Sequence, residues 1–286
     1  MPPANIPHVQ ALQWIKRFDV AYLSCVPAHL HQMLREWPAA TAPRLPWLRL
    51  LRTSSAALPV ATLEAVRARV SPNVYVNYGA TEAGPMVAAP PELLARHPQA
   101  VGMPLPGIEV QIVDADDRPC AVGATGRLRV RGEGVLSAYL RAVPAEAAQV
   151  FRGGWCYPGD LGHVNAEGVI FLEGRSDEAM NFNGIMIHPA EIEAVLGDCP
   201  QVEEVAAFAL PAAESQHVPA AAVVVRDGLP MAALQQYGMD RLGARAPRLI
   251  VPVAVIPRNA AGKVLRRQLA DEVLARLRAG GSAGLP

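Results

Sequence analysis

The sequence predicts an α/β fold in three consecutive parts: an α/β subdomain over residues 1–100, a small β subdomain over 101–176 and an α+β domain over 177–286. Three observations support this division. Amphipathic helical segments alternate with short apolar strands up to residue 76, which is typical of a largely parallel sheet covered by helices. From about residue 101, short alternating strands are separated by Gly, Pro and Asp, which favours antiparallel pairing. After Asp177, helices and strands return in mixed order.

In the first part, apolar residues recur at helical spacing, and a proline opens one of the helices. Helices are expected over residues 8–18, 28–37 and 60–70, and strands over 20–27, 48–53 and 74–76. Two of these strands lead into turns of small and polar residues, Ser54–Ala56 and Asn77–Gly84. Open α/β sheets bind ligands at the carboxyl ends of their strands, so we expect both turns to lie at a ligand site.

The remaining elements follow from period-2 alternation and from proline and glycine positions. In the β subdomain, the strands lie in VGMPLPGIEVQIVD, GRLRVRG and GVIFLEGR. In the last domain, helices are expected over 189–197, 231–244 and 264–278, and strands over 203–210, 219–226 and 251–256.

Composition and charge exclude several classes of protein. The hydrophobic fraction of 51% and the charged fraction of 18% are those of a folded globular protein. Lys+Arg 26 balance Asp+Glu 26, so no basic field is present to attract nucleic acid. No apolar stretch is long enough to span a membrane. The four cysteines are widely spaced, without a CxxC or a Cys/His cluster, which predicts a cytoplasmic protein without a zinc site.

The turn NYGATEAG combines an aromatic ring, a hydroxyl and a carboxylate. Tyr78 can stack on a purine, Thr81 can contact a phosphate, and Glu82 can bind Mg²⁺, which prefers hard oxygen ligands. The alternative is a strand-to-helix turn in which Thr81 is the N-cap and Glu82 lies in the first helical turn.

Three other polar residues lie on turns. Asp160 follows a Pro-Gly pair and can accept two ribose hydroxyls, or it is a plain hairpin residue. Arg175 can reach a phosphate or ribose, or it is a surface arginine. Only Lys16 and Lys263 are lysine among the 26 basic residues, so a lysine in the Asn-Ala-Ala-Gly-Lys loop suggests a mobile positive charge with a function. The alternative is a solvated loop lysine.

The order of these segments resembles the adenylate-forming superfamily, which comprises acyl- and aryl-CoA synthetases, peptide-synthetase adenylation domains and luciferases. The resemblance runs from about residue 10 to 278. The matching segments are SSAALP (family GGAPL), NYGATEAG (YGxTE), VGMPLPGIEVQIVD (GxPxPG), GRLRVRG (GELxVRG), GWCYPGDLG (GWxxTGDLG), GRSDEAMNFNGIMIHPAEIE (GRxDDxIKxxGxxIxPxEIE) and IPRNAAGKVLRRQL (PRTxxGKxxR). The resemblance implies part of the family's large domain, α/β with a β-barrel-like subdomain, followed by its small mobile C-terminal domain.

The resemblance also implies roles for the nucleotide-site residues of the first two parts. Ser55, Asn77, Tyr78 and Gly79 would line the adenine pocket, with Tyr78 stacked on the ring. Thr81 would meet the α-phosphate. The other two implied contacts are Mg²⁺ at Glu82 and the ribose hydroxyls at Asp160.

In the last domain and its approach, the resemblance implies that Arg175 helps to hold the ribose and that Asp177 is the hinge of the mobile domain. Lys263 would stabilise the carboxylate and the α-phosphate as the acyl-adenylate forms. The Asn183–Ile187 turn, with Asn183 and Gly184, would line the tunnel of the thiol.

The activity so implied is an AMP-forming ligase that activates a carboxylic acid, fatty or aryl, with ATP and Mg²⁺ and passes it to the thiol of CoA or of an acyl carrier protein. The family's phosphate loop, SGTTGxPK, is not in the sequence, and Pro158 and Asn181 replace the usual Thr and Lys. Without that loop, we expect part of an acyl ligase: either a truncated piece of the enzyme or one half of a split enzyme with a complementary N-terminal polypeptide as its partner. The alternatives are a degenerate, non-catalytic protein that binds AMP, an acyl-adenylate or a carrier, and a structural or interaction protein that kept only the fold.

Overall fold

The computed structural model describes residues 8–36, 45, 47–140, 144–211, 217–226, 228–259 and 262–279 of the 286-residue chain. Internal contacts divide the chain into two units, Met1–Leu172 and Glu173–Pro286. The division falls inside strand β11 (Ile170–Arg175).

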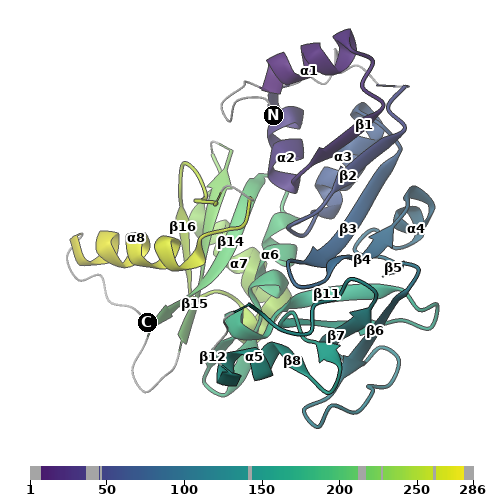
Figure 1. Cartoon of the computed structure of the whole chain (residues 1–286). Coiled ribbons are helices and arrows are strands. Elements are labelled where there is room, and N and C mark those ends of the chain that lie inside the picture. Colours follow the sequence, from purple (N-terminus) through teal and green to yellow (C-terminus); the bar gives the residue numbers. More distant parts are fainter. Residues whose placement is uncertain are drawn as a thin grey trace. The chain divides into compact units, whose positions relative to one another are not determined.

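The first unit opens with a five-stranded sheet in the order β1-β2-β3-β4-β5 (Figure 1). Its elements are α1 (His8–Arg17), β1 (Tyr22–Cys25), α2 (Pro27–Glu36), β2 (Leu50–Thr53), α3 (Val60–Arg69), β3 (Val74–Ala80), β4 (Gly84–Ala89), α4 (Pro91–Arg96) and β5 (Met103–Pro104). Strands β1, β2 and β3 are parallel, because a helix connects each to the next. The β3–β4 and β4–β5 pairs are antiparallel, so the expectation of a largely parallel layer holds only as far as β3.

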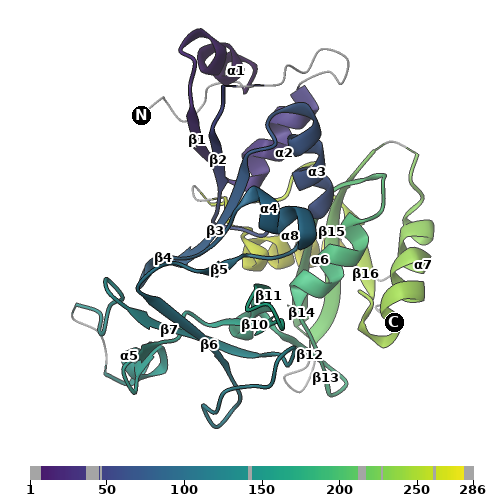
Figure 2. The ribbon, with the colours of Figure 1, turned by 90° about the vertical axis from the view of Figure 1, so that its right-hand side faces the viewer.

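The core of this sheet is aliphatic. Leu30 of α2, Leu51 of β2 and Leu63 of α3 are almost completely buried in one cluster. Helices α2 and α3 contact each other beside the sheet (Figure 2). This packing holds the parallel strands in register, so the turns after β2 and β3 leave the sheet at the same edge.

A second sheet has the order β11-β10-β7-β9-β8, with β6 also paired to β7. Its elements are β6 (Ile108–Val113), β7 (Gly126–Gly132), α5 (Pro144–Val150), β8 (Phe151–Arg152), β9 (Trp155–Cys156), β10 (Asp160–Val164) and β11. Strand β7 pairs antiparallel with β6, β9 and β10, as the alternating pattern predicts. Leu128, Val130 and Ile170 lie in the core of this sheet. Helix α5 is not predicted by the sequence pattern.

In the second unit, a central sheet of β14, β15 and β16 is covered on both faces (Figure 1). The elements are the 3₁₀ turn Ser176–Glu178, β12 (Met180–Phe182), β13 (Ile185–Ile187), α6 (Pro189–Gly197), β14 (Val202–Pro211), β15 (His217–Val225), α7 (Met231–Leu242), β16 (Leu249–Pro252) and α8 (Arg266–Ala279). Successive residues of β14 face opposite ways: Ala207 lies in the cluster of α6 and α7, and Phe208 lies in the cluster of α8. The strand expected at 251–256 lies at Leu249–Pro252, so it begins two residues earlier and ends four residues earlier than expected.

Prolines mark several helix starts. Helices α2, α4, α5 and α6 have proline as their first residue, and Pro59 and Pro230 are the N-caps of α3 and α7. The first turn of a helix leaves its N–H groups without helical partners, so proline loses nothing there. Among the described residues, no helix is long and apolar enough to cross a membrane.

Strand β3 turns back directly into β4, and this hairpin depends on Gly79. A Cβ atom at residue 79 would lie 2.3 Å from the carbonyl oxygen of Gly84, on the opposite strand. The clash is with the backbone of Gly84, which cannot move away without opening the hairpin. We therefore expect Gly79→Ala to lower the free energy of unfolding by about 2 kcal/mol, measured by urea denaturation.

The matched control is Gly197→Ala, at the end of α6. Its added Cβ would meet a methyl group of Val205 at 3.6 Å, which is ordinary contact. We expect a change of less than about 0.5 kcal/mol. Equal losses in the two variants would contradict the close approach as the cause.

Candidate active site

The segment Asn77–Gly84 forms the β3–β4 hairpin. Tyr78 pairs with Val87 across the two strands, and the amide of Ala83 donates to the carbonyl of Ala80 at 3.2 Å. The alternative of a strand-to-helix turn capped by Thr81 is therefore wrong. Thr81 is exposed at the tip of the turn, with Glu82 half-buried beside it.

Two of the residues predicted to bind the nucleotide contact each other between the two sheets of the first unit. The Tyr78 hydroxyl donates to Oδ2 of Asp160 at 2.5 Å, although the two residues are 82 positions apart. Tyr78 comes from β3 and Asp160 is the first residue of β10. Strands β9 and β10, on either side of the Pro-Gly pair, both run antiparallel to β7, so the chain does not reverse before Asp160 and the alternative of a hairpin residue is wrong.

The turn after β2 lies at the same edge. Thr53 pairs with Val76 in the parallel β2–β3 ladder. Ser55 therefore leaves β2 beside Asn77 and Tyr78. Ser55 is exposed and has a left-handed φ of 76°, which is uncommon for a residue other than glycine. The residues predicted for the adenine side thus come from neighbouring strands of one sheet.

Glu82 has a partner that sequence reasoning missed. The Tyr139 hydroxyl donates to Oε1 of Glu82, and the Leu136 amide donates to the Glu82 carbonyl at 2.8 Å. The ring of Tyr139 packs edge-on against Phe151 with centroids 4.9 Å apart. The hydrogen bond to Glu82 raises the pKa of Tyr139 to about 12, so the phenol stays protonated and continues to donate.

The residues present fit a magnesium ion bound mainly by water and phosphate. Among the described residues, no three His, Cys, Asp or Glu side chains gather to hold a metal ion. Mg²⁺ is commonly held by one or two carboxylates together with waters and substrate phosphates. Glu82, a partly accessible carboxylate next to the exposed Thr81, matches that requirement.

Two of the thiols are poor nucleophiles. Burial raises the pKa of Cys25 to about 12, and burial followed by the charge of Glu82 raises the pKa of Cys156 to about 11. The reactive form of cysteine is the thiolate, which is scarce at neutral pH for such groups.

In the second unit, Arg175 and Asp177 form a two-pronged ion pair. Arg175 Nε donates to Oδ1 of Asp177 at 2.7 Å, and an Nη donates to Oδ2 at 3.1 Å. The Arg175 hydrogen bond holds the pKa of Asp177 below its usual range. The residues predicted for ribose binding and for the hinge are therefore bonded to each other across the beginning of the 3₁₀ turn.

The Asn183–Gly184 turn is a two-residue hairpin loop between β12 and β13. Phe182 pairs with Ile185, and Asn183 and Gly184 have φ of 50° and 80°. Positive φ at both positions is the type I′ geometry that Asn-Gly favours. The Asn181 side chain accepts from the Gly184 amide at 3.2 Å, which accounts for an asparagine at this position.

Lys263 lies on a loop that is tied together at its base. Asn259 Oδ1 accepts from the Lys263 amide at 2.9 Å, and an Nη of Arg258 donates to the Gly262 carbonyl at 3.0 Å. The Lys263 side chain is 53% exposed, with Nζ 3.7 Å from Oε1 of Glu178. Its ammonium is thus accessible and only loosely paired.

Behind this loop, Arg266 anchors α8, and sequence reasoning did not single it out. Its guanidinium donates to Glu178 at 3.0 Å, to Glu193 at 2.5 Å and to the Ala207 carbonyl at 2.8 Å. Burial alone would lower the pKa of Arg266, but the two carboxylates outweigh burial and raise it. The glutamates lie far from Arg266 in sequence, and although both belong to the matched segment GRSDEAMNFNGIMIHPAEIE, the motif match assigned them no role.

The predicted site residues therefore fall in both units. Those of the first unit are Ser55, Asn77, Tyr78, Gly79, Thr81, Glu82 and Asp160, and those of the second are Arg175, Asp177, Asn183, Gly184 and Lys263. The same two parts of the chain match two sequence models of known families. Residues 1–140 match "AMP-binding enzyme", and residues 191–263 match "AMP-binding enzyme C-terminal domain". The chain belongs to the adenylate-forming superfamily.

Curated relatives of this adenylate-forming chain include CoA ligases. The 2-succinylbenzoate--CoA ligase of Geobacillus kaustophilus is 34% identical over 264 residues, which cover 91% of this chain and 53% of that protein. The long-chain-fatty-acid--CoA ligase of Escherichia coli O157:H7 is 32% identical over 197 residues, 68% of this chain and 35% of that protein. The chain spans about half the length, or less, of these relatives.

Solved structures agree with this family assignment. The amide bond synthetase McbA of Marinactinospora thermotolerans superposes with a TM-score of 0.85 at 30% identity, over 94% of this chain and 55% of that one. The o-succinylbenzoate CoA synthetase of Bacillus subtilis, in complex with its acyl-adenylate intermediate, gives 0.79 at 28% identity, over 93% and 54%. Another structure of the Bacillus enzyme is in complex with ATP and magnesium ion.

Proposed function

We propose that this chain takes part in the AMP-forming activation of a carboxylic acid and its transfer to a thiol. The observation that carries the proposal is the 2.5 Å hydrogen bond between Tyr78 and Asp160. Two motif residues that the resemblance assigns to one nucleotide are neighbours in space, although 82 positions separate them. Relatives named as CoA ligases support the same chemistry.

In this proposal, Tyr78 stacks on adenine in a pocket to which Ser55, Asn77 and Gly79 contribute. Asp160 is a carboxylate that can accept both ribose hydroxyls in charge-assisted hydrogen bonds. The ribose would then replace the Tyr78 hydroxyl as the donor to Asp160.

Thr81 and Glu82 face the phosphates. The Thr81 hydroxyl can donate to the α-phosphate, and Glu82 would hold Mg²⁺, which neutralises phosphate charge when bound. Tyr139 already occupies one oxygen of Glu82, and the other carboxylate oxygen is the natural ligand. Because the sequence contains no SGTTGxPK loop, we assign no contact to the β- and γ-phosphates. A polypeptide that carries such a loop is a proposed partner.

The second unit contributes a positive charge and the thiol path. The Lys263 ammonium would stabilise the negative charge shared by the carboxylate and the α-phosphate as the acyl-adenylate forms. Arg175 would assist at the ribose, and a rotation at Asp177 would exchange the groups that face the substrate. Asn183 and Gly184 would line the thiol tunnel.

The acid is proposed to be an aryl or fatty acid, with CoA or a carrier-protein phosphopantetheine as acceptor. Relatives are named for 2-succinylbenzoate, indoleacetate and long-chain fatty acids, which spans both acid classes. Four free cysteines are consistent with action in a reducing cytoplasm.

The test measures two quantities on residues 1–286. The first is AMP affinity by calorimetry, for the unaltered chain and for Asp160→Asn. The second is pyrophosphate release from ATP and Mg²⁺ with a panel of aryl and fatty acids, with and without a polypeptide that carries the phosphate loop. AMP binding that Asp160→Asn weakens at least about tenfold supports the site. Acid-dependent release supports the ligase, and binding without release under either condition favours a non-catalytic AMP-binding protein.

A further inference from the structure

We propose that Tyr157 is a positioning residue for Asp160, and that a network beginning at Asp117 holds Tyr157 in place. The inference rests on the proposed function, because it concerns how the ribose-binding carboxylate is aimed. Tyr157 lies three residues before Asp160, and the network lies entirely within the first unit.

The backbone that carries Asp160 departs from the regular ladder. Cys156 lies opposite Val130 on β7, and Leu161 lies opposite Arg127. Three steps along β7 therefore correspond to five steps along the facing segment, which leaves two extra residues. Such a bulge re-aims a side chain, and Gly159, with φ of 91°, supplies the required turn. The direction of Asp160 therefore depends on what anchors the ends of the bulge.

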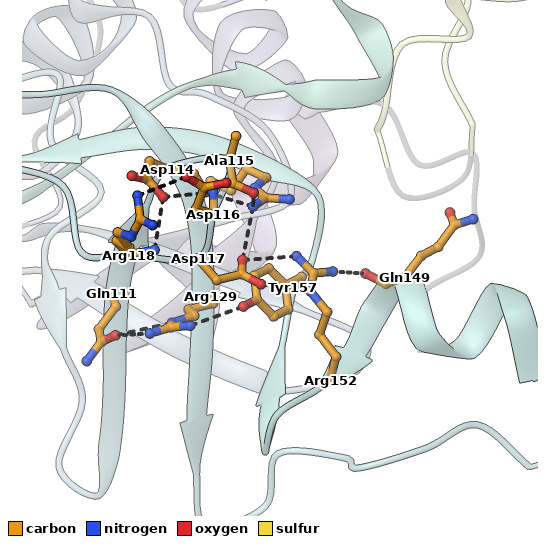
Figure 3. A network of polar contacts seen from close by, with 11 residues as sticks. Gln111, Asp114, Ala115, Asp116, Asp117, Arg118, Arg129, Gln149, Arg152 and Tyr157 are labelled. Atoms are coloured by element: carbon orange, nitrogen blue, oxygen red, sulfur yellow. Dashed lines mark hydrogen bonds and ion pairs between the residues drawn. The ribbon is translucent and has the colours of Figure 1, made fainter.

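Tyr157 anchors the first end of the bulge. Its amide donates to the Val150 carbonyl at 2.7 Å, and its hydroxyl accepts from Arg129 at 3.2 Å. The Arg152 guanidinium lies over its ring, 3.6 Å from the ring centre. Figure 3 shows the phenol ring of Tyr157 between these two arginines. Tyr157 is only 6% exposed, so the ring has little freedom to move.

Arg152 is held by Asp117, which also binds a second arginine. Asp117 accepts from Arg152 at 3.2 and 3.3 Å and from Arg127 at 3.0 Å, and Arg152 also donates to the Gln149 carbonyl at 2.9 Å (Figure 3). The hydrogen bond from Arg152 holds the pKa of Asp117 below its usual range, so the carboxylate stays charged at neutral pH.

Arg129 is fixed from two other directions. It donates to Gln111 Oε1 at 2.6 and 3.1 Å, and its guanidinium lies 4.4 Å from the ring centre of Trp155. An arginine with several partners is pre-organised, and so is the ring that it contacts. The bulge thus begins at a rigid point, while Asp160 at its other end meets the Tyr78 hydroxyl.

The test compares two ligands, AMP and 2′,3′-dideoxy-AMP, which lacks the hydroxyls that Asp160 would accept. The ratio of their dissociation constants reports on the groups that hold the ribose hydroxyls, and among the variants tested here only the contribution of Asp160 is altered. For the unaltered chain, we expect the dissociation constant of dideoxy-AMP to exceed that of AMP by a factor of at least about 10. For Asp160→Asn, we expect this ratio to fall to about 1.

We expect Tyr157→Phe, which keeps the ring and loses the hydroxyl, to reduce the ratio about threefold, and Tyr157→Leu to reduce it about tenfold. Affinity for dideoxy-AMP should stay within about twofold in both variants, since this ligand offers Asp160 no ribose hydroxyl to accept. The matched control is Asp116→Asn, in the same loop as Asp117. Asp116 pairs with the exposed Arg118 at 2.9 Å, away from Tyr157, so the ratio should not change.

A merely structural role for Tyr157 predicts that both ligands weaken equally, and that outcome overturns the inference. An unchanged ratio in Tyr157→Leu also overturns it. If the unaltered chain does not distinguish the ligands, or if Asp160→Asn does not alter the ratio, the ribose role of Asp160 fails, and the inference fails with it. A ratio that collapses in Asp160→Asn and persists in Tyr157→Leu rejects the positioning role alone. Because Tyr157→Phe preserves the packed ring, it remains informative if the leucine variant does not fold.

Discussion

Replacing Lys263 by alanine is expected to slow acyl-adenylate formation by about 10²- to 10³-fold. The ammonium would stabilise charge that develops between the carboxylate and the α-phosphate, and alanine leaves that charge without a partner. The geometry permits this role, because the Lys263 side chain is 53% exposed and its ion pair with Glu178 is long at 3.7 Å. The effect is measured as acid-dependent pyrophosphate release. The assay uses residues 1–286 alone, or together with a polypeptide that carries the phosphate loop if only that mixture is active.

The second half-reaction supplies the contrast. Thioester formation from a supplied acyl-adenylate should change by no more than about twofold in Lys263→Ala, since the adenylate that Lys263 helps to form is already made. Lys263→Arg tests whether charge alone suffices or whether a compact ammonium is needed. Lys16→Ala is the matched control, because Lys16 is the chain's other lysine and lies on α1. Equal loss in both half-reactions would remove the role assigned to Lys263.

Replacing Arg266 by methionine is expected to lower the free energy of unfolding of the second unit by about 3 kcal/mol. The side chain is 22% exposed, and it donates to two carboxylates and one carbonyl. Without Arg266, Glu178 and Glu193 lose their common counter-charge in a partly buried place. Urea denaturation followed by circular dichroism gives the size of the loss, and hydrogen exchange of β14 and β15 locates it.

Two further variants separate charge from packing. Arg266→Met combined with Glu193→Gln should recover part of the loss, because one uncompensated carboxylate is gone. Arg245→Met is the matched control: Arg245 pairs with Glu191 at 3.1 Å but its side chain is 46% exposed, so the cost should be below about 1 kcal/mol. Similar losses for Arg245→Met and Arg266→Met would contradict the role of burial.

Helices were predicted well where a strong local signal was present. The helix expected over residues 8–18 spans His8–Arg17, and the one expected over 189–197 spans Pro189–Gly197. Amphipathic spacing and a proline at the first position are local features, and local energetics decide where such helices begin.

The elements that were missed carry weak local signals. Strand β4 reads GPMVAA, without alternation, and exists because β3 turns back to pair with it. Helices α4 and α5 are short, at six and seven residues, and lack a long amphipathic pattern. The strand-to-helix alternative for the segment after Tyr78 was therefore wrong, because a hairpin forms there instead of a helix.

The sequence by itself determined the order of most elements, the family and the chemical identity of the predicted site residues. The sequence motifs that carry this information reflect short-range requirements of the backbone, such as Asn-Gly for a type I′ turn. Such requirements can be recognised directly from neighbouring residues in the sequence. Tertiary structure alone decided that Tyr78 bonds to Asp160, that Tyr139 holds Glu82, and that Tyr157 sits between two arginines. These contacts join strands and loops that are distant in sequence. Sheet register and bulges set them, and no periodicity in the chain encodes either.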